Sequence, residues 1–231
     1  MASLHNLQEK NVFRSFLIFT FLLTGILNVG FSINSSNFRV KTIEIESTSN
    51  KYDSTDFSKE VLYQSIWLIN SDTFISKKMQ YPTIENLEVL KDYPDKVVLV
   101  INEHAEIIVI SDLRGTIPVR NILYKNGLEV PSSEVGELPT IVVTNGPVEV
   151  GFNGELISMI MTLKNYNLDS SNLSFNYDGE KLRGVYSETF IDFGPPVDLG
   201  TKAAALGALL EKSECSGEVR FLGSEELTAN C

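Results

Sequence analysis

The pattern of apolar and polar positions changes twice along the chain. An uncharged apolar run occupies residues 16–33. Mixed helical and alternating patterns follow over residues 38–105, and mainly strand-like alternation over residues 106–231. The sequence therefore predicts an α+β fold, with a short tail at 1–15, a transmembrane helix, and two domains joined near residue 105.

The apolar run is long enough to cross a membrane. Its 18 residues carry no charge, and as a helix they would span roughly 27 Å, close to the hydrocarbon thickness of a bilayer. The alternative is a cleavable signal peptide, but its apolar segment is usually only about 7–15 residues and ends in a small-x-small site. No Ala-x-Ala follows here, so the pattern favours an uncleaved anchor.

The orientation of this anchor depends on the lengths of its flanks. Lys10 and Arg14 precede the run, and Arg39 and Lys41 follow it. The positive-inside count is therefore nearly tied. Because the preceding tail is short and almost the whole chain follows, we expect a cytoplasmic N-terminus and extracytoplasmic C-terminal domains.

The first domain combines two helices with three strands. Two apolar pairs in its first strand are out of phase, which indicates a bulge near residues 41–42. Ser54 or Asp56 is expected to cap the first helix, and Asp72 the second. The expected elements are a strand at 38–47, helices at 54–66 and 73–80, and a hairpin over 82–104 that turns at Asp92-Tyr93-Pro94-Asp95.

The second domain is rich in strands and has two helices. Asn126-Gly127 predicts a tight hairpin, because this pair suits the left-handed turn that strand twist requires. Asp178-Gly179 marks another turn. The expected elements are a hairpin at 122–130, strands at 107–110, 138–143, 173–177, 183–193 and 219–222, and helices at 155–165 and 201–212.

Composition and charge exclude several classes of protein. Hydrophobic residues make up 43% and charged residues 21% of the 231 positions, which is ordinary globular usage and excludes a wholly disordered chain or a multi-pass membrane protein. The net charge of −11 would repel nucleic-acid phosphates. It would also repel anionic lipid head groups, apart from any inserted segment.

The cysteines and histidines give little support for catalysis. Cys215 and Cys231 both lie in the exported part, where a disulfide can persist, although two free thiols are the alternative. The only histidines are His5 and His104, and no nucleophile elbow, zinc-protease motif or phosphate-binding loop is present. We therefore expect no enzyme activity, no cofactor, no metal and no small-molecule substrate.

A set of motifs in the exported part resembles the FtsQ/DivIB family of bacterial cell-division proteins. The aromatic-Pro turn at Tyr93-Pro94, followed by a strand that ends in Glu103, is similar to the family's most recognisable stretch. The other segments that carry the resemblance are residues 38–45, the hairpin at 122–127, Leu138-Pro139, residues 197–200 and Lys202. The sequence departs from the family pattern at His104, where a basic residue such as Arg is usual, and at Lys125, where an acid is usual.

The resemblance implies a POTRA domain, a C-terminal β domain and a scaffolding role in the divisome. The chain would be a single-pass protein of the bacterial inner or plasma membrane. It would bind FtsB/DivIC-like and FtsL-like partners outside the membrane and help to regulate septal peptidoglycan synthesis. The expected mechanism is strand addition, in which a partner segment pairs with an open sheet edge.

The closing strand is the predicted docking edge. Its residues are Glu218, Val219, Arg220, Phe221 and Leu222. The alternative is that residues 224–231 fold back over this edge, held by the Cys215–Cys231 pair. The sequence also leaves open two other functions: a POTRA-bearing secretion or transport component, and a membrane-anchored cell-wall hydrolase that uses two of the many carboxylates.

Overall fold

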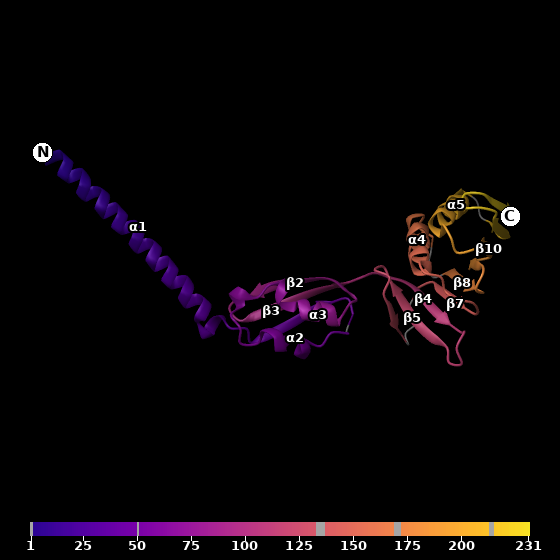
Figure 1. The fold of residues 1–231 in the computed structure, drawn as a ribbon, viewed down its shortest axis with the longest axis horizontal. Helices are drawn as coiled ribbons and strands as arrows, with labels where there is room; N and C mark the ends of the chain where they lie inside the picture. The colour runs from indigo at the N-terminus through magenta and orange to yellow at the C-terminus, as the bar shows by residue number, and fades with distance from the viewer. Residues whose placement is uncertain (1, 50, 133–136, 169–171, 213–214) are drawn as a thin grey trace. The chain divides into compact units, whose positions relative to one another are not determined.

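The computed structural model describes residues 2–49, 51–132, 137–168, 172–212 and 215–231 (Figure 1). The chain separates into two compact units, Met1–Glu103 and His104–Cys231. The domain boundary predicted from the sequence, residue 105, lies two residues beyond Glu103.

The chain opens with one long helix, α1 (Ala2–Asn34), drawn in indigo in Figure 1. Its segment Arg14–Asn34 has a mean hydropathy of 2.1 and is long and apolar enough to cross a membrane. The predicted tail at 1–15 is part of the same helix. Polar side chains within the apolar segment bond to carbonyls one turn back, as in Asn28 Nδ2 to the Thr24 oxygen at 2.8 Å, which lowers the cost of placing them in lipid.

The rest of the first unit is a three-stranded sheet with short helices. In the sheet order β1-β3-β2, β1 is parallel and β2 antiparallel to the central strand β3. Buried residues from the strands and helices form one core, which includes Phe57, Phe74 and Leu99. The elements are η1 (Ser36–Phe38), β1 (Thr42–Ser47), α2 (Ser54–Val61), η2 (Ile66–Leu68), η3 (Ser71–Phe74), α3 (Ile75–Gln80), β2 (Ile84–Asp92) and β3 (Lys96–Glu103).

The predicted irregularity near residues 41–42 is present: the amides of Lys41 and Thr42 both donate to the Asp95 carbonyl, at 2.8 and 3.3 Å, so two residues face one. The regular strand β1 begins only at Thr42, and Val40 pairs with a different segment. The Val40 amide donates to the Gln64 carbonyl at 2.9 Å, and the Tyr63 amide donates to the Val40 carbonyl at 2.9 Å. The change of phase in the sequence therefore marks a change of pairing partner.

The helix caps also differ from the prediction. Asp53 caps α2 by accepting from the Thr55 amide, and Asn70 forms a reciprocal capping box with Thr73 at η3. Short polar residues on either side of a helix start can all accept such bonds. The sequence therefore predicted where each helix begins, but not which residue caps it. The first helix ends at Val61 rather than near 66, because the next residues turn to pair with Val40.

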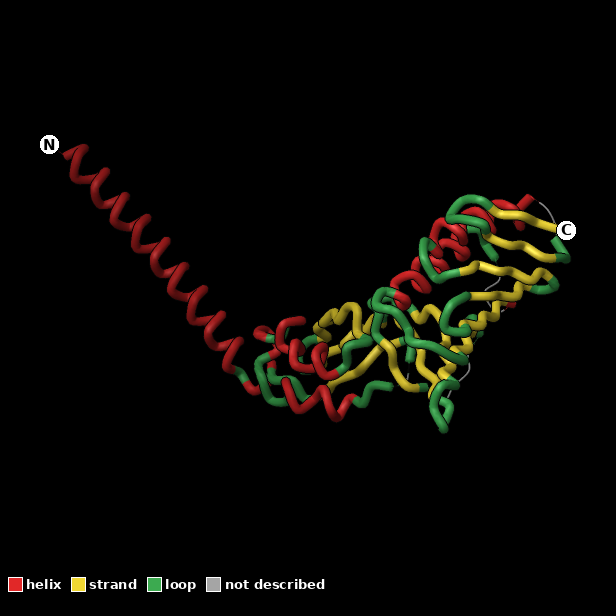
Figure 2. Tube along the Cα trace, turned by 45° about the vertical axis from the view of Figure 1, so that its right-hand side comes forward, coloured by secondary structure: helices red, strands yellow, loops and turns green. Residues whose placement is uncertain are grey.

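The second unit contains a nine-stranded mixed sheet in the order β12-β11-β10-β9-β8-β7-β4-β5-β6. In Figure 2 its strands near the C-terminus lie side by side with helices beside them. The strands are β4 (Glu106–Asp112), β5 (Val119–Tyr124), β6 (Glu129–Pro131), β7 (Thr140–Val143), β8 (Leu173–Tyr177), β9 (Leu182–Tyr186), β10 (Thr189–Gly194), β11 (Glu218–Phe221) and β12 (Leu227–Asn230).

Two helices pack against this sheet, as predicted. They are α4 (Phe152–Asn165) and α5 (Leu199–Lys212). Their apolar faces, with Leu156, Ile160 and Leu206, share a core with residues from seven of the strands. A smaller cluster, built on Val109 and Tyr124, is separate from it. The α+β class of the prediction is confirmed.

Two strand predictions in this unit need correction. Residues 183–193 are not one strand, because the chain reverses at Ser187, whose φ of 51° lies in the left-handed region, and β9 and β10 pair as a hairpin. A further strand, β12, follows the predicted closing strand. The Asn126-Gly127 turn is confirmed: Gly127 has a φ of 85° and its amide donates to the Tyr124 carbonyl at 2.9 Å.

Candidate functional site

The predicted docking strand, β11, is an interior strand of the sheet. It pairs in parallel with β10 on one side and antiparallel with β12 on the other. Both rows of its backbone groups are therefore used within the fold. The prediction that the closing strand is an open edge is wrong, and the alternative, in which the C-terminal residues cover it, describes the fold.

The side chains of β11 serve the core and the surface in alternation. Val219 and Phe221 are buried, and the Phe221 ring stacks on Phe193 with centroids 5.5 Å apart. Glu218 and Arg220 point outward and form an ion pair at 2.8 Å. Leu222 lies just beyond the strand and is exposed. Of the five predicted residues, Val219 and Phe221 therefore stabilise the unit and do not offer side chains to a partner.

The open edge at this end of the sheet is β12. The amide of Leu222 donates to the Glu226 carbonyl at 2.9 Å, which makes this a hydrogen-bonded pair of the antiparallel ladder. Hydrogen-bonded and non-bonded pairs alternate along such a ladder. With the register Phe221–Leu227 and Val219–Ala229, the backbone N–H and C=O groups of Leu227 and Ala229 point away from β11.

The composition of β12 leaves these backbone groups accessible. Thr228, Ala229 and Asn230 are exposed, small or polar and uncharged. Natural edge strands are often protected by Lys, Pro or a bulge, and β12 has none of these. The opposite end of the sheet differs, because β6 has only three residues and ends in Pro131, which has no N–H to offer.

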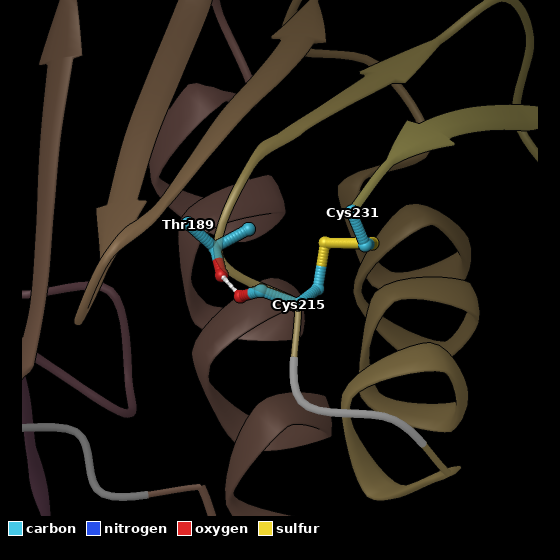
Figure 3. The surroundings of a disulfide bond; sticks show 3 residues. All are labelled: Thr189, Cys215 and Cys231. Atoms are coloured by element: carbon cyan, nitrogen blue, oxygen red, sulfur yellow. Dashed lines mark hydrogen bonds between the residues drawn. A yellow bond between two sulfur atoms is a disulfide. The ribbon is translucent and has the colours of Figure 1, made fainter.

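A disulfide holds β12 in place. Cys215, before β11, is bonded to Cys231, after β12, so the bridge closes a segment that contains the whole β11–β12 hairpin (Figure 3). The Thr189 hydroxyl donates to the Cys215 carbonyl, as the dashed line in Figure 3 indicates. Backbone, disulfide and side chain together fix the edge strand to the body of the sheet.

The glycine at the start of β11 permits this close fit. A Cβ atom on Gly217 would overlap the carbonyl oxygen of Asn230. Only a residue without a side chain allows the end of β12 to approach so closely. The position of the edge strand therefore depends on Gly217 as well as on the disulfide.

Lys202, one of the residues that carried the resemblance, is buried in this unit. Its Nζ donates to the carbonyls of Phe193 and Pro195, each at 2.9 Å. Burial lowers the pKa of its ammonium, partly opposed by Asp198 and Glu155. Lys202 thus fixes the loop between β10 and α5 and does not face a binding site.

The described residues offer little that resembles a catalytic centre. A cleft of about 640 Å³ beside the disulfide is lined by Leu168, Tyr186, Thr189, Leu210 and others, and Glu188 is the only carboxylate among its described lining residues. Within the described part of the chain, no group of three His, Cys, Asp or Glu side chains could hold a metal ion. The absence of enzyme activity and of cofactors stays a prediction.

Sequence reasoning missed β12 for a clear reason. Leu227 is the only large apolar residue in Leu227-Thr228-Ala229-Asn230, so the strand has almost no alternation to detect. The available signals were the Gly223-Ser224 turn and the terminal cysteine. Comparison with protein-family models gives no match to this chain, and comparison with curated proteins also gives none.

Proposed function

We propose that this chain is a single-pass membrane scaffold that binds a partner segment by strand addition at β12. By its resemblance to the FtsQ/DivIB family, the setting is the bacterial divisome, and the partners are the extracytoplasmic parts of FtsB/DivIC-like and FtsL-like proteins. The outcome of binding would be regulation of septal peptidoglycan synthesis.

The order of elements supports this proposal. An apolar helix of membrane-spanning length comes first, and a strand-helix-helix-strand-strand unit follows it, the order expected of a POTRA domain. A larger strand-rich unit comes last. Such a chain combines an anchor with a sheet that could bind a partner, and it needs no catalytic centre to act.

The observation that carries the proposal is the pair of outward-facing backbone positions on β12, Leu227 and Ala229. An added strand would receive two N–H groups and two C=O groups from them. Because backbone atoms make most of these bonds, partner binding should tolerate side-chain changes on β12 but not the loss of an outward N–H.

The test is a matched pair of substitutions at one position. Ala229→Pro removes an outward N–H and places the proline ring where the partner strand would lie. Ala229→Val keeps the N–H and suits a strand. We expect Ala229→Pro to weaken capture of the partner segments by about tenfold or more, which corresponds to about 1.4 kcal/mol, and Ala229→Val to bind like the wild type.

The measurement is a two-component pull-down, with circular dichroism to verify that both variants fold. The same pull-down with secretion-system components tests whether the setting is cell division. If folded Ala229→Pro captures its partners as the wild type does, β12 is not the docking edge. Proline at Val219, Arg220 or Phe221 would be uninformative, because it would break the interior ladder of β11.

A further inference from the structure

The first unit carries an aromatic surface, formed by the exposed Tyr63, Trp67, Leu68 and Tyr93 and by Phe38, which is half-buried and also packs against the core. Three of the rings follow one another: the centroids of Phe38 and Trp67 are 5.5 Å apart, and those of Trp67 and Tyr93 are 4.8 Å apart. Exposed fractions are 69% for Tyr63, 42% for Trp67, 65% for Leu68 and 49% for Tyr93. A large part of these apolar side chains therefore stays in contact with solvent.

The backbone at this surface also holds an unfavourable conformation. Tyr63 has a φ of 65°, which costs a bulky residue free energy. Its amide donates to Val40, and its carbonyl accepts from Arg39 Nη1 at 3.2 Å. These bonds keep the Tyr63 ring in solvent beside the first residues that follow α1.

Two cations adjoin the aromatic surface. Arg39 bonds to the Tyr63 carbonyl, and Lys91 Nζ donates to the Trp67 carbonyl at 3.2 Å. Neither has a carboxylate partner among the residues that the structure describes, whereas nearby Lys41 is paired with Asp95 at 2.7 Å. In a chain of net charge −11, this surface therefore carries two cationic side chains that form no ion pair with the described residues.

The chain length limits how far this surface can lie from the membrane. The apolar segment of α1 ends at Asn34, and Phe38 follows four residues later. Four residues reach at most about 14 Å, even when fully extended. The head-group layer on each side of the hydrocarbon is roughly 5–8 Å deep, so Phe38 is restricted to the head-group layer or its immediate neighbourhood.

We propose that the aromatic surface is embedded in the lipid head-group layer of the membrane that α1 spans. Tryptophan and tyrosine favour this layer because their rings are apolar and their N–H or O–H groups can bond to water and lipid. Arg39 and Lys91 would bind lipid phosphates. The contact would hold the first unit against the bilayer. It depends on the membrane anchor and not on the divisome role or on β12.

Trp67 makes the proposal directly measurable, because it is the only tryptophan in the chain. The full-length protein is reconstituted in phosphatidylcholine vesicles, with and without phosphatidylglycerol, that contain lipids spin-labelled either near the head group or near the chain end. We expect Trp67 fluorescence to be quenched several-fold more by the head-group label than by the chain-end label. We also expect Trp67 to be protected from aqueous iodide.

The control moves the tryptophan to the other end of the same unit. The double substitution Trp67→Phe, Met79→Trp places it on α3 at an exposed position. The neighbouring Lys78 bonds to Glu85 at the start of β2, whereas Lys91 lies at its end. Glu85 and Lys91 are six positions apart along β2, which corresponds to about 20 Å. We expect the control to be open to iodide and not quenched by either lipid label.

Two results would overturn the proposal. One is a Trp67 that is as open to iodide as the control and unaffected by labelled lipid. The other is protection that appears only at high protein-to-lipid ratio without lipid quenching, which would indicate a second copy of the chain as the occupant. A variant with Arg39→Gln and Lys91→Gln should lose part of its protection in the vesicles that contain phosphatidylglycerol, because charge attraction is removed.

Discussion

The aromatic surface of the first unit and the β12 edge of the second unit offer different kinds of atoms. The aromatic surface presents rings and two cationic side chains. The β12 edge presents backbone N–H and C=O groups, with small uncharged side chains between them. The contacts of the aromatic surface depend on the chemistry of its side chains, which suits a lipid head-group layer. The contacts of the β12 edge depend on backbone hydrogen bonds, which any extended segment can form.

This difference separates the substitutions that should affect each surface. Truncating side chains of the aromatic surface should weaken its contact with lipid, and truncating side chains of β12 should hardly affect partner binding. Loss of an outward N–H of β12, or displacement of that strand, should weaken partner binding and leave the lipid contact of Trp67 unchanged. Each prediction below tests whether the two units, and their surfaces, respond independently.

The largest effect is expected from truncating one core aromatic ring in each unit. Phe57, in the first unit, stacks on Tyr81 with centroids 5.8 Å apart, and Phe193, in the second unit, stacks on Phe221. Both are fully buried. Phe57→Ala and Phe193→Ala should each lower the free energy of unfolding of their own unit by about 3–5 kcal/mol.

Amide hydrogen exchange, read peptide by peptide in urea, separates the two units in this experiment. Each variant should lose protection only within Met1–Glu103 or only within His104–Cys231. Loss of protection in both units from either substitution would mean that they unfold together, and the comparison of two independent surfaces would then fail.

Most helices and strands could be predicted from the sequence, whereas the edge strand β12 could not, because the two predictions depend on different signals. Turn residues between two β-rich runs located the hairpin of β2 and β3. Helical spacing located α4 and α5, since burial of one face imposes that period. The partner strand for Val40 could not be predicted, because pairing between distant segments depends on tertiary packing.

The disulfide provides the next test, and its effect should be confined to the second unit. It closes a segment with a sequence separation of 16, and such a loop contributes up to about 3 kcal/mol in the chain-entropy account. Replacing both Cys215 and Cys231 with Ser should lower the free energy of unfolding of the second unit by up to that amount. It should also speed exchange of the Thr228 and Asn230 amides.

Reduction of the wild-type protein supplies the control for this pair. The reduced protein should match the double Ser variant in urea unfolding, because both lack the cross-link. Unchanged stability and unchanged β12 exchange in both samples would show that the bridge does not fix the edge, and β12 would then depend on its backbone bonds alone.

The candidate site was predictable in region but not in residue. The sequence predicted docking at the strand of residues 218–222 and left open a fold-back held by Cys215 and Cys231. It could not decide between them, because the answer depends on how closely Asn230 can approach Gly217. The aromatic surface gave no signal in sequence, since Phe38, Trp67 and Tyr93 are brought together only by folding.

Adding one methyl group beside β12 should affect partner binding but not lipid contact, and it leaves the disulfide in place. In Gly217→Ala the new Cβ would overlap the Asn230 carbonyl, so the end of β12 must move. We expect a loss of about 1–3 kcal/mol in the second unit and several-fold weaker capture of partner segments. The lipid quenching of Trp67 should not change. Leu68→Ser should do the reverse: it should lower that quenching and leave capture intact.

The smallest expected effect is a difference in acid sensitivity within the second unit. Arg114 donates to Asp112 from Nε at 2.9 Å and from Nη2 at 2.6 Å. These bonds are the main cause that lowers the pKa of Asp112 from 3.8 to about 2. A carboxylate whose pKa is lower in the folded state stabilises it above pH 4, and this contribution is lost as the pH falls toward 2.

Asp112→Asn removes this titration and isolates it from all other acid effects. At pH 7 the variant should be less stable than the wild type by about 1 kcal/mol or less, because the pair is partly exposed and screened by solvent. The difference should shrink between pH 4 and pH 2, as Asp112 of the wild type takes up its proton. Urea midpoints of both proteins across this range measure it, and exchange of first-unit amides should be the same in both. A difference that stays constant with pH would mean that the Asn side chain perturbs packing, and that the ion pair with Arg114 does not stabilise the second unit.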